Sequence, residues 1–263
     1  MIRKHKNDYK VGYNAIASVD DQSDIACMDF GIIKLDRDDI YVNNEAKERA
    51  ILLIFGKVTL AFEGKEEMVS RGSFLDENPV CLHLPKDVEV TITAQASSEL
   101  AYEAVYNDTA FDTKIYTQEE CITDQFGKGV MGETSLRHVR TVIDDDVAPY
   151  SNLVIGEVIN FPGKWSSYPA HHHIHPEIYH YRFYPDQGFG FSCEGEKVFK
   201  VRDKDTAVIK GGMVHPQTSA PGYAMYYIWL IPHTPTRWRK DREFISDDDW
   251  LLKENPVIWP DKE

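Results

Sequence analysis

The sequence predicts an all-β protein made of two barrels, and three observations carry this prediction. Short apolar or alternating runs rich in Val, Ile, Leu and Phe recur along the chain, as in "RAILLIFGKVTLAFEG" at residues 49–64. Gly, Pro and Asp separate these runs at short intervals, which is typical of sandwiches and barrels. The first half shows no sustained helical periodicity, and the second half repeats its plan.

The strand-like runs fall into two groups with a less patterned segment between them. After residues 49–64, the first group continues with "GSFLDENPVCLHLPKDVEVTITAQ" and "ELAYEAVYN". The second contains "NLVIGEVINFPGKW", "EIYHYRFYP", "GFGFSCEGEKVFKVRDKDTAVIKGG" and "YAMYYIWLIPH". Residues 111–147 are more polar, so we predict an N-terminal barrel at 1–110, a linker at 111–147 and a C-terminal barrel at 148–263.

The C-terminal tail, "TRWRKDREFISDDDWLLKENPVIWP", holds three of the five tryptophans. A tail with this many large apolar side chains usually packs onto a neighbouring barrel or subunit. We therefore expect it to contribute to assembly.

Bulk composition excludes several classes of protein. A net charge of -14 repels phosphate backbones, so nucleic-acid binding is not expected. The basic start, "MIRKHKNDYKVGYN", is followed by no apolar stretch, and no window approaches the ~18 apolar residues of a membrane span. We expect a cytoplasmic protein that binds no membrane. The four cysteines are widely spaced without a CxxC pair, which predicts buried reduced thiols.

The strongest functional signal is "HHHIHPE" at residues 171–177. It is no purification tag, because it lies past mid-chain and is interrupted. His171 and His173 are two apart and project to one face of an extended strand, and Glu177 returns to that face if the chain bends at Pro176. His215 follows "IKGGMV" at a turn that could bring a third imidazole into the same barrel.

Three histidines and one glutamate leave coordination positions open, which marks a catalytic divalent metal site rather than a closed structural one. The spacing His-x-His-x-x-x-Glu with a distant His is the ligand signature of metal-dependent cupins. A histidine-rich surface loop would explain the cluster alone, but the context of His215 argues against it. His172 is predicted to face away or toward solvent, and His175 could contact a ligand side chain or the substrate.

The residues also resemble a known family. "GKWSSYPAHHH", "PEIYHYRFYPDQGFGF" and "APGYAMYYIWLIP" are similar to the 5-deoxy-glucuronate isomerase branch of the KduI/IolB isomerases. "FGIIKL", "ERAILLIFGKVTL" and "LHLPKDVEVTITA" extend the resemblance to the first half. It implies a bicupin, meaning two jelly-roll β-barrels in one chain, and assembly into a homo-oligomer. Its implied cofactor is one divalent ion per chain, with zinc favoured over manganese, iron or nickel, and its implied ligands are His171, His173, Glu177 and His215.

The sequence departs from the family in two places. Family members carry a longer loop between the His pair and the Glu, whereas here three residues separate His173 from Glu177, and such a change can alter specificity or turnover. The first half offers no His pair in "YVNNEAKERA", and its superposition on the second places Glu89 rather than His83 opposite His215. We therefore expect a metal-free first barrel that serves packing and assembly, with His83 an ordinary strand residue.

The activity implied by the resemblance is an aldose–ketose isomerisation through an enediolate, from 5-deoxy-glucuronate to 5-keto-2-deoxy-gluconate in myo-inositol catabolism. The group that moves the proton stays open among Glu177, His175, Tyr179 and Tyr181. Candidate substrate contacts are Arg182, Tyr227 and Trp229, although Arg182 should point away from the face of Glu177 and is equally well explained by a salt bridge. Tyr227 and Trp229 are otherwise ordinary core.

Two further functions fit the same residues. Cupins with His and Glu ligands also support iron-dependent dioxygenases, and oxygen dependence of turnover would separate these from an isomerase. A non-catalytic sugar-acid binding protein would bind the ligand without consuming it. The open ligand set favours an enzyme, and the chain has no DNA-binding segment that would suit a regulator.

Overall fold

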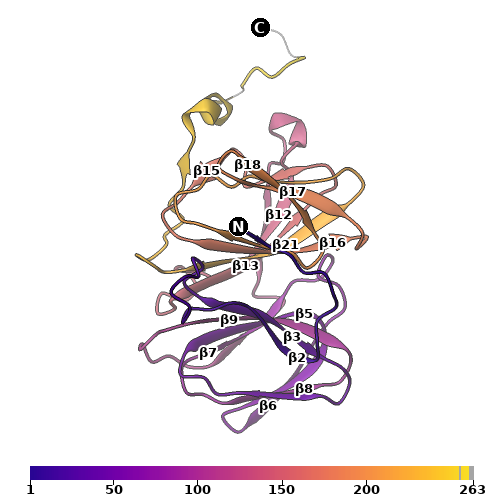
Figure 1. The fold of residues 1–263 in the computed structure, drawn as a ribbon, viewed down its shortest axis with the longest axis vertical. Helices are drawn as coiled ribbons and strands as arrows, with labels where there is room; N and C mark the ends of the chain where they lie inside the picture. The colour runs from indigo at the N-terminus through magenta and orange to yellow at the C-terminus, as the bar shows by residue number, and fades with distance from the viewer. Residues whose placement is uncertain (255, 261–263) are drawn as a thin grey trace.

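The computed structural model describes residues 1–254 and 256–260 (Figure 1). In this part of the chain the regular structure is β, apart from two short 3₁₀ helices, η1 (Met131–Glu133) and η2 (Ser246–Leu252). The prediction of a mainly β protein is confirmed. Neither of these helices has the length or apolar character needed to cross a membrane.

A seven-stranded antiparallel sheet carries most of the second half. Its strand order is β1 (Ile2–Arg3), β19 (Thr206–Ile209), β16 (Glu177–Tyr184), β21 (Ala224–Pro232), β13 (Leu153–Asn160), β12 (Arg137–Ile143) and β11 (Ile122–Phe126). A four-stranded sheet lies against it, with the order β14 (Trp165–Ser166), β20 (Gln217–Ser219), β17 (Phe189–Glu194) and β18 (Lys197–Arg202). The pair β15 (His171–His172) and β22 (Glu243–Phe244) completes this half.

A nine-stranded sheet carries the first half. Its main path is β10 (Lys114–Tyr116), β7 (Val80–Leu84), β5 (Glu48–Phe62), β9 (Ser98–Val105), β3 (Asp29–Leu35) and β2 (Gly12–Ala17), and β4 (Ile40–Asn43), β6 (Lys65–Arg71) and β8 (Val90–Ala94) branch from it. The long strand β5 pairs with β7 and β9 first and with β6 and β8 afterwards. Gly56 lies at the change, with φ +116, where a Cβ would lie 2.2 Å from Ser98 Oγ.

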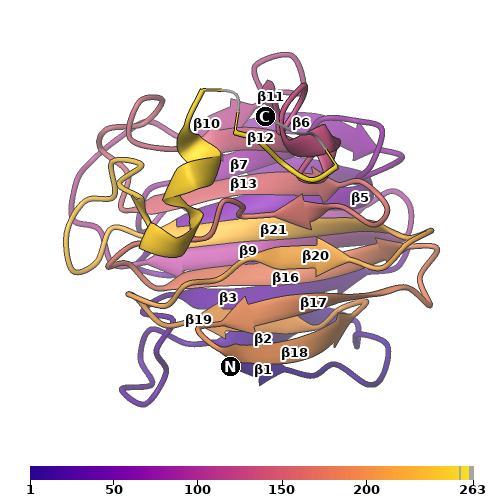
Figure 2. The same ribbon diagram turned by 90° about the horizontal axis from the view of Figure 1, so that it is seen from above.

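Three apolar layers separate the sheets. The central layer lies between the two large sheets and contains residues such as Leu52 and Ile228. The other two lie inside each half, with Ile51 in the first and Tyr227 in the second. Side chains alternate between the two faces of a strand, so β5 contributes to the central layer and to the layer of the first half. In the same way, β21 contributes to the central layer and to the layer of the second half. Figure 2, seen from above, shows the strands of both large sheets crossing the molecule in similar directions.

Buried ion pairs cross the central layer. Arg71 donates to both carboxylate oxygens of Glu157 at 2.7 and 2.8 Å, and Arg182 donates to Glu99 at 2.5 Å. Each pair joins the first half to the second. Removing one partner of such a pair leaves an uncompensated buried charge, so these contacts fix how the halves dock.

The segment predicted as a linker contains regular structure. Residues 111–147 include β10, which pairs with β7, and the pair β11 and β12, which extends the seven-stranded sheet. All five residues of β11 are exposed, so no apolar alternation marks the strand in the sequence. The N-terminal strand β1 also pairs with β19 of the second half. The division into barrels at 1–110 and 148–263 stays a prediction.

One smaller expectation needs correction, and the tail needs description. Cys27 is exposed rather than buried, because it lies in a turn with φ 56 between β2 and β3, whereas Cys81 is buried and all four cysteines are free thiols. The three tryptophans of the tail differ in burial. Trp238 is 2% exposed, but Trp250 and Trp259 are 43% and 88% exposed.

Candidate active site

A close approach between two segments builds the centre of the site. Glu177 begins β16 and pairs with Ile209, the last residue of β19, so the turn that follows β19 lies beside the histidine cluster. The amide of Gly212 donates to the His173 carbonyl at 2.7 Å. A Cβ at Gly211 would lie 2.0 Å from the Ile174 carbonyl oxygen. The "GG" of "IKGGMVH" therefore permits the approach that positions His215.

The residues brought together are His173, Glu177 and His215. Glu177 Oε2 lies 3.2 Å from His173 Nε2 and 3.2 Å from His215 Nε2, and the candidate ligand atoms of all three lie within 4.8 Å of one another. All three side chains are buried. Met213 orients one ring, because its carbonyl accepts a hydrogen bond from His215 Nδ1 at 2.8 Å.

This group fits a divalent cation. His215 Nε2 is buried and makes no well-aligned hydrogen bond among the described residues, although Glu177 is near. Its Nδ1 proton is committed to Met213, so the Nε2 lone pair is directed at the same point as the carboxylate. Two imidazoles and one carboxylate converging on one point, with room beside them, form the donor set of a catalytic metal site.

The electrostatics of the group follow from the same contacts. Burial alone would raise the pKa of Glu177, but the hydrogen bond to His173 and the close contact with His215 hold it well below its usual value. Burial alone would lower the pKa of His215, but the negative charge of Glu177 at 3.2 Å raises it. Glu177 is therefore a carboxylate at neutral pH, and its negative charge is available to a cation.

His171, the fourth predicted ligand, lies beside the three residues whose candidate ligand atoms are within 4.8 Å of one another. Its ring centroid is 5.2 Å from that of His215, and its Nδ1 lies 3.0 Å from the Pro169 carbonyl oxygen. Burial and the neighbouring His215 lower the pKa of His171 to about 3, so its ring is neutral. A neutral imidazole in this position can accept a proton or hold a metal ion.

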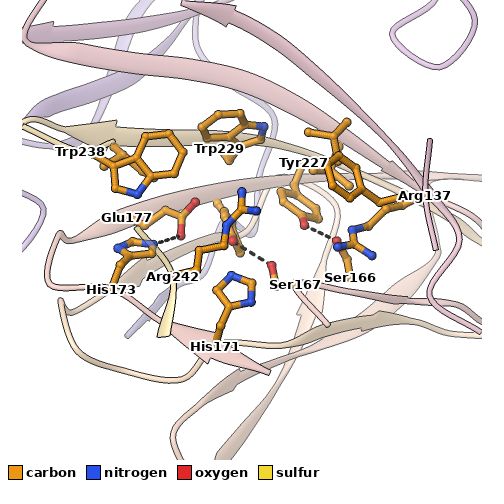
Figure 3. Close-up of a pocket in the computed structure, with 15 residues that line it drawn as sticks. Arg137, Ser166, Ser167, His171, His173, Glu177, Tyr227, Trp229, Trp238 and Arg242 are labelled. Atoms are coloured by element: carbon orange, nitrogen blue, oxygen red, sulfur yellow. Dashed lines mark hydrogen bonds and ion pairs between the residues drawn. The ribbon is translucent and has the colours of Figure 1, made fainter. Parts of the chain in front are cut away.

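The group opens into a pocket in the second half (Figure 3). Its empty volume is about 540 Å³, which includes space open to solvent. Tyr179 shares a hydrogen bond with Ser167 at 3.0 Å, and Tyr227 shares one with Ser166 at 2.6 Å. Trp229 forms part of the wall. Tyr179, Tyr227 and Trp229 therefore lie where the sequence predicts them.

Three other predicted residues lie outside this pocket. His175 Nε2 donates to the Thr236 carbonyl at 2.7 Å, and Tyr181 donates to Gln217 at 2.6 Å. Arg182 faces the central layer, where it pairs with Glu99 and with Asp203.

The reasons for these placements differ. The chain bends between His173 and Glu177, so the alternation that would align His175 with His173 does not hold. Tyr181 is directed to the inner face of β16 as expected, but too far along the strand to reach the pocket. Arg182 points away from the face of Glu177, as the alternation of side chains along a strand predicts. His172 is also placed as predicted, with its side chain 31% exposed.

Sequence reasoning missed several residues of the pocket, above all Arg137, Trp238 and Arg242. Arg137 begins β12, inside the segment predicted as a linker. Trp238 and Arg242 belong to residues 233–245, which we call the C-terminal strap. The strap reaches the site because β22 pairs with β15 at His171 and the Ile245 amide donates to the Ala170 carbonyl at 3.1 Å. The run "RWRKDR" was the only signal available.

The profile of the KduI/IolB family matches residues 1–250 of this chain. The chain belongs to the KduI/IolB family. A curated relative from Bacillus licheniformis, named 5-deoxy-glucuronate isomerase, is 23% identical over 274 aligned positions, which cover 96% of this chain and 98% of the relative. The predicted family and the predicted enzymatic character are confirmed.

Solved structures agree on the fold of this KduI/IolB member. An IolB-like protein from Salmonella typhimurium LT2 superposes with a TM-score of 0.84 at 20% identity, covering 93% of this chain and 97% of that protein. A cupin 2 conserved barrel domain protein from Leptotrichia buccalis gives 0.53 at 14% identity, with 87% and 92% covered. At these identities the likeness concerns the fold alone, and it is a cupin-like fold.

Proposed function

We propose that this KduI/IolB member is a metal-dependent aldose–ketose isomerase of a uronic-acid-type sugar, converting 5-deoxy-glucuronate to 5-keto-2-deoxy-gluconate in myo-inositol catabolism. The observation that carries the proposal is the convergence of His173, Glu177 and His215 on one point at the pocket. Relatives named 5-deoxy-glucuronate isomerase supply the reaction.

His173, Glu177 and His215 would hold one divalent ion, with His171 as a fourth ligand. A bound ion would supply Lewis-acid polarisation of the substrate carbonyl and its neighbouring hydroxyl. This polarisation favours loss of the proton on the hydroxyl-bearing carbon next to the carbonyl. Zinc suits two or three imidazoles and one carboxylate, and manganese, iron and nickel remain alternatives.

The protein's own groups divide the remaining tasks. Burial and the charge of Glu177 raise the pKa of Tyr179 well above 10, so its hydroxyl stays protonated and acts as a hydrogen-bond donor to a substrate oxygen. Burial likewise raises the pKa of Tyr227 to about 12. Glu177, if it leaves the ion, is the remaining candidate for moving the proton, since His175 and Tyr181 lie outside the pocket. Trp229 would pack against the carbon skeleton.

Assembly is a second part of the proposal. Trp250 and Trp259 stay exposed in the tail, at 43% and 88%, and a second copy of the chain could cover them. We propose a homo-oligomer of bicupin chains whose first barrel lacks a metal and serves packing.

The reaction is tested by following 5-deoxy-glucuronate with ¹³C NMR in the presence of the metal-loaded protein. We expect loss of the aldehyde or hemiacetal carbon signal and appearance of a ketone signal at the same rate under air and under nitrogen. Turnover only under air would replace the isomerase with an oxygen-dependent enzyme. Saturable binding without turnover would leave a sugar-acid binding protein.

A further inference from the structure

Two arginines line the pocket from separate parts of the chain. Arg137 begins β12, and Arg242 lies on the C-terminal strap just before β22. In Figure 3 both are drawn with the pocket residues, and Arg137 lies toward Ser166 and Tyr227, away from His173 and Glu177. The pocket therefore contains two cationic groups besides the candidate metal ligands.

Neither guanidinium forms an ion pair with a carboxylate of residues 1–254 or 256–260. Arg71 and Arg182 behave differently, because Arg71 pairs with Glu157 and Arg182 pairs with Glu99. The buried Arg49 also lacks a carboxylate partner among the described residues, but the Lys47, Pro85 and Val88 carbonyls and the Asn43 side chain accept its donors. In a chain of net charge -14, carboxylates are abundant, yet within the described part of the chain Arg137 donates only to the Ser135 carbonyl at 2.8 Å and, at 3.5 Å, to that of Tyr168.

The geometry of Arg137 leaves donors for a ligand. A guanidinium has five N–H donors, and these two carbonyl contacts use part of them. Phe126 contacts its face, with the guanidinium carbon 5.4 Å from the ring centroid, which orients the plane. Arg242 is exposed and forms no hydrogen bond among the described residues, so its full set of donors is available.

The positive charges of Arg137 and Arg242 repel each other. Burial lowers the pKa of Arg137, and the positive charge of Arg242 lowers it further, whereas the carboxylate partners of Arg71 and Arg182 raise theirs against the effect of burial. An anion placed between Arg137 and Arg242 would relieve their repulsion. Planar, forked donors of this kind match a carboxylate better than a neutral hydroxyl.

We propose that Arg137 and Arg242 bind the carboxylate of the substrate and make the site selective for sugar acids over neutral aldoses. This assignment rests on the proposed isomerase function. Arg137 is the fixed part of the carboxylate site, and Arg242 completes it from the strap. Arg182, which the sequence suggested for this role, is committed to Glu99 and Asp203.

The test compares two sugars that differ only at the acid group, 5-deoxy-glucuronate and 5-deoxy-glucose. In Arg242→Gln we expect kcat/KM for the acid to fall about tenfold or more, the loss of a charge-assisted contact, and kcat/KM for the neutral sugar to change little. Arg137→Lys keeps the positive charge but removes the paired N–H donors of the guanidinium. It should therefore lower the ratio of kcat/KM for the acid to kcat/KM for the neutral sugar. Arg239→Gln is the matched control, since Arg239 lies on the strap, is 72% exposed and lies outside this pocket.

Equal losses for both sugars in Arg242→Gln, or an unchanged preference for the acid, overturn the proposal. A wild-type protein that converts neither sugar contradicts the isomerase function but leaves the carboxylate site testable by binding. Trp229 and Trp238 line the pocket, so their fluorescence reports occupancy. Saturable quenching by D-glucuronate but not by D-glucose, weakened about tenfold or more in Arg242→Gln, supports the site. Equal quenching by both sugars, or quenching by neither, refutes it.

Discussion

Replacing Glu177 by glutamine removes one negative charge from the candidate metal centre without changing its shape. Glu177 Oε2 lies 3.2 Å from both His173 Nε2 and His215 Nε2, and the side chain is 4% exposed. The amide fills the same space, so packing is kept. The two imidazoles lose the anion that balances a divalent charge, and we expect metal affinity to fall.

The size of the effect can be bounded. Losing a group that only supports a ligand costs about 10- to 100-fold in metal affinity, so losing the anionic ligand itself should cost about 100-fold or more, which is ~2.7 kcal/mol. At a free metal concentration ~1,000 times the wild-type Kd, binding stabilises the wild type by ~4.1 kcal/mol and the Glu177→Gln variant by only ~1.4 kcal/mol. At roughly 2–4 °C per kcal/mol, the metal-induced rise in Tm should be about 5–10 °C smaller in the variant.

The assay is thermal unfolding with and without added metal, paired with a competition titration against a chelator. His172→Gln is the matched control, because His172 is the neighbouring histidine, is 31% exposed and lies 3.8 Å from Glu243 rather than in the pocket. A Glu177→Gln variant that binds metal within about threefold of the wild type, with the same rise in Tm, would refute the reasoning.

Three more outcomes are expected. His171→Gln should weaken metal binding by about 10- to 100-fold if this imidazole completes the ligand set, as a chelator titration would reveal; unchanged affinity would remove it from the set. Arg182→Gln leaves the buried Glu99 and the half-buried Asp203 without their partner, and should lower the free energy of unfolding by about 3–5 kcal/mol in urea denaturation while the metal-induced rise in Tm persists. Burial lowers the pKa of His171 to about 3 and that of His180 well below 6.5, so the unfolded chain takes up protons first as pH falls. The free energy of unfolding of the metal-free protein should therefore decrease below pH ~6.5, by up to ~1.4 kcal/mol per pH unit for each histidine, and the contribution of His171 should level off near pH 3. A flat profile between pH 7.5 and 5.5 would contradict this.

The convergence of the candidate ligands was predictable because their spacing is local and chemically restrictive. His173 and Glu177 lie on one short segment, and the glycine pair Gly211 and Gly212 before His215 predicts a tight turn. The alternation of side chains along β16 also places Tyr179 on the face of Glu177 and Arg182 on the opposite face. These inferences needed only the periodicity of a strand.

The rest of the pocket depends on contacts between distant segments. Arg137 reaches it because β12 joins the seven-stranded sheet, and the exposed partner strand β11 gives no apolar pattern to signal this. Arg242 reaches it because the strap returns to pair with β15. The partner of Arg182, Glu99, belongs to the first half. His175 lies outside the pocket because the bend before Glu177 breaks the alternation that a straight strand would keep.

The most direct test of the account follows activity against metal content in one preparation. The protein is stripped with a chelator, reloaded stepwise with one divalent ion, and assayed at each step for conversion of 5-deoxy-glucuronate to the keto acid. The account predicts no conversion in the stripped protein and a linear recovery that ends at about one ion per chain, as expected for a single site of two or three imidazoles and one carboxylate. Full activity in the stripped protein, or full metal loading without conversion, would contradict it.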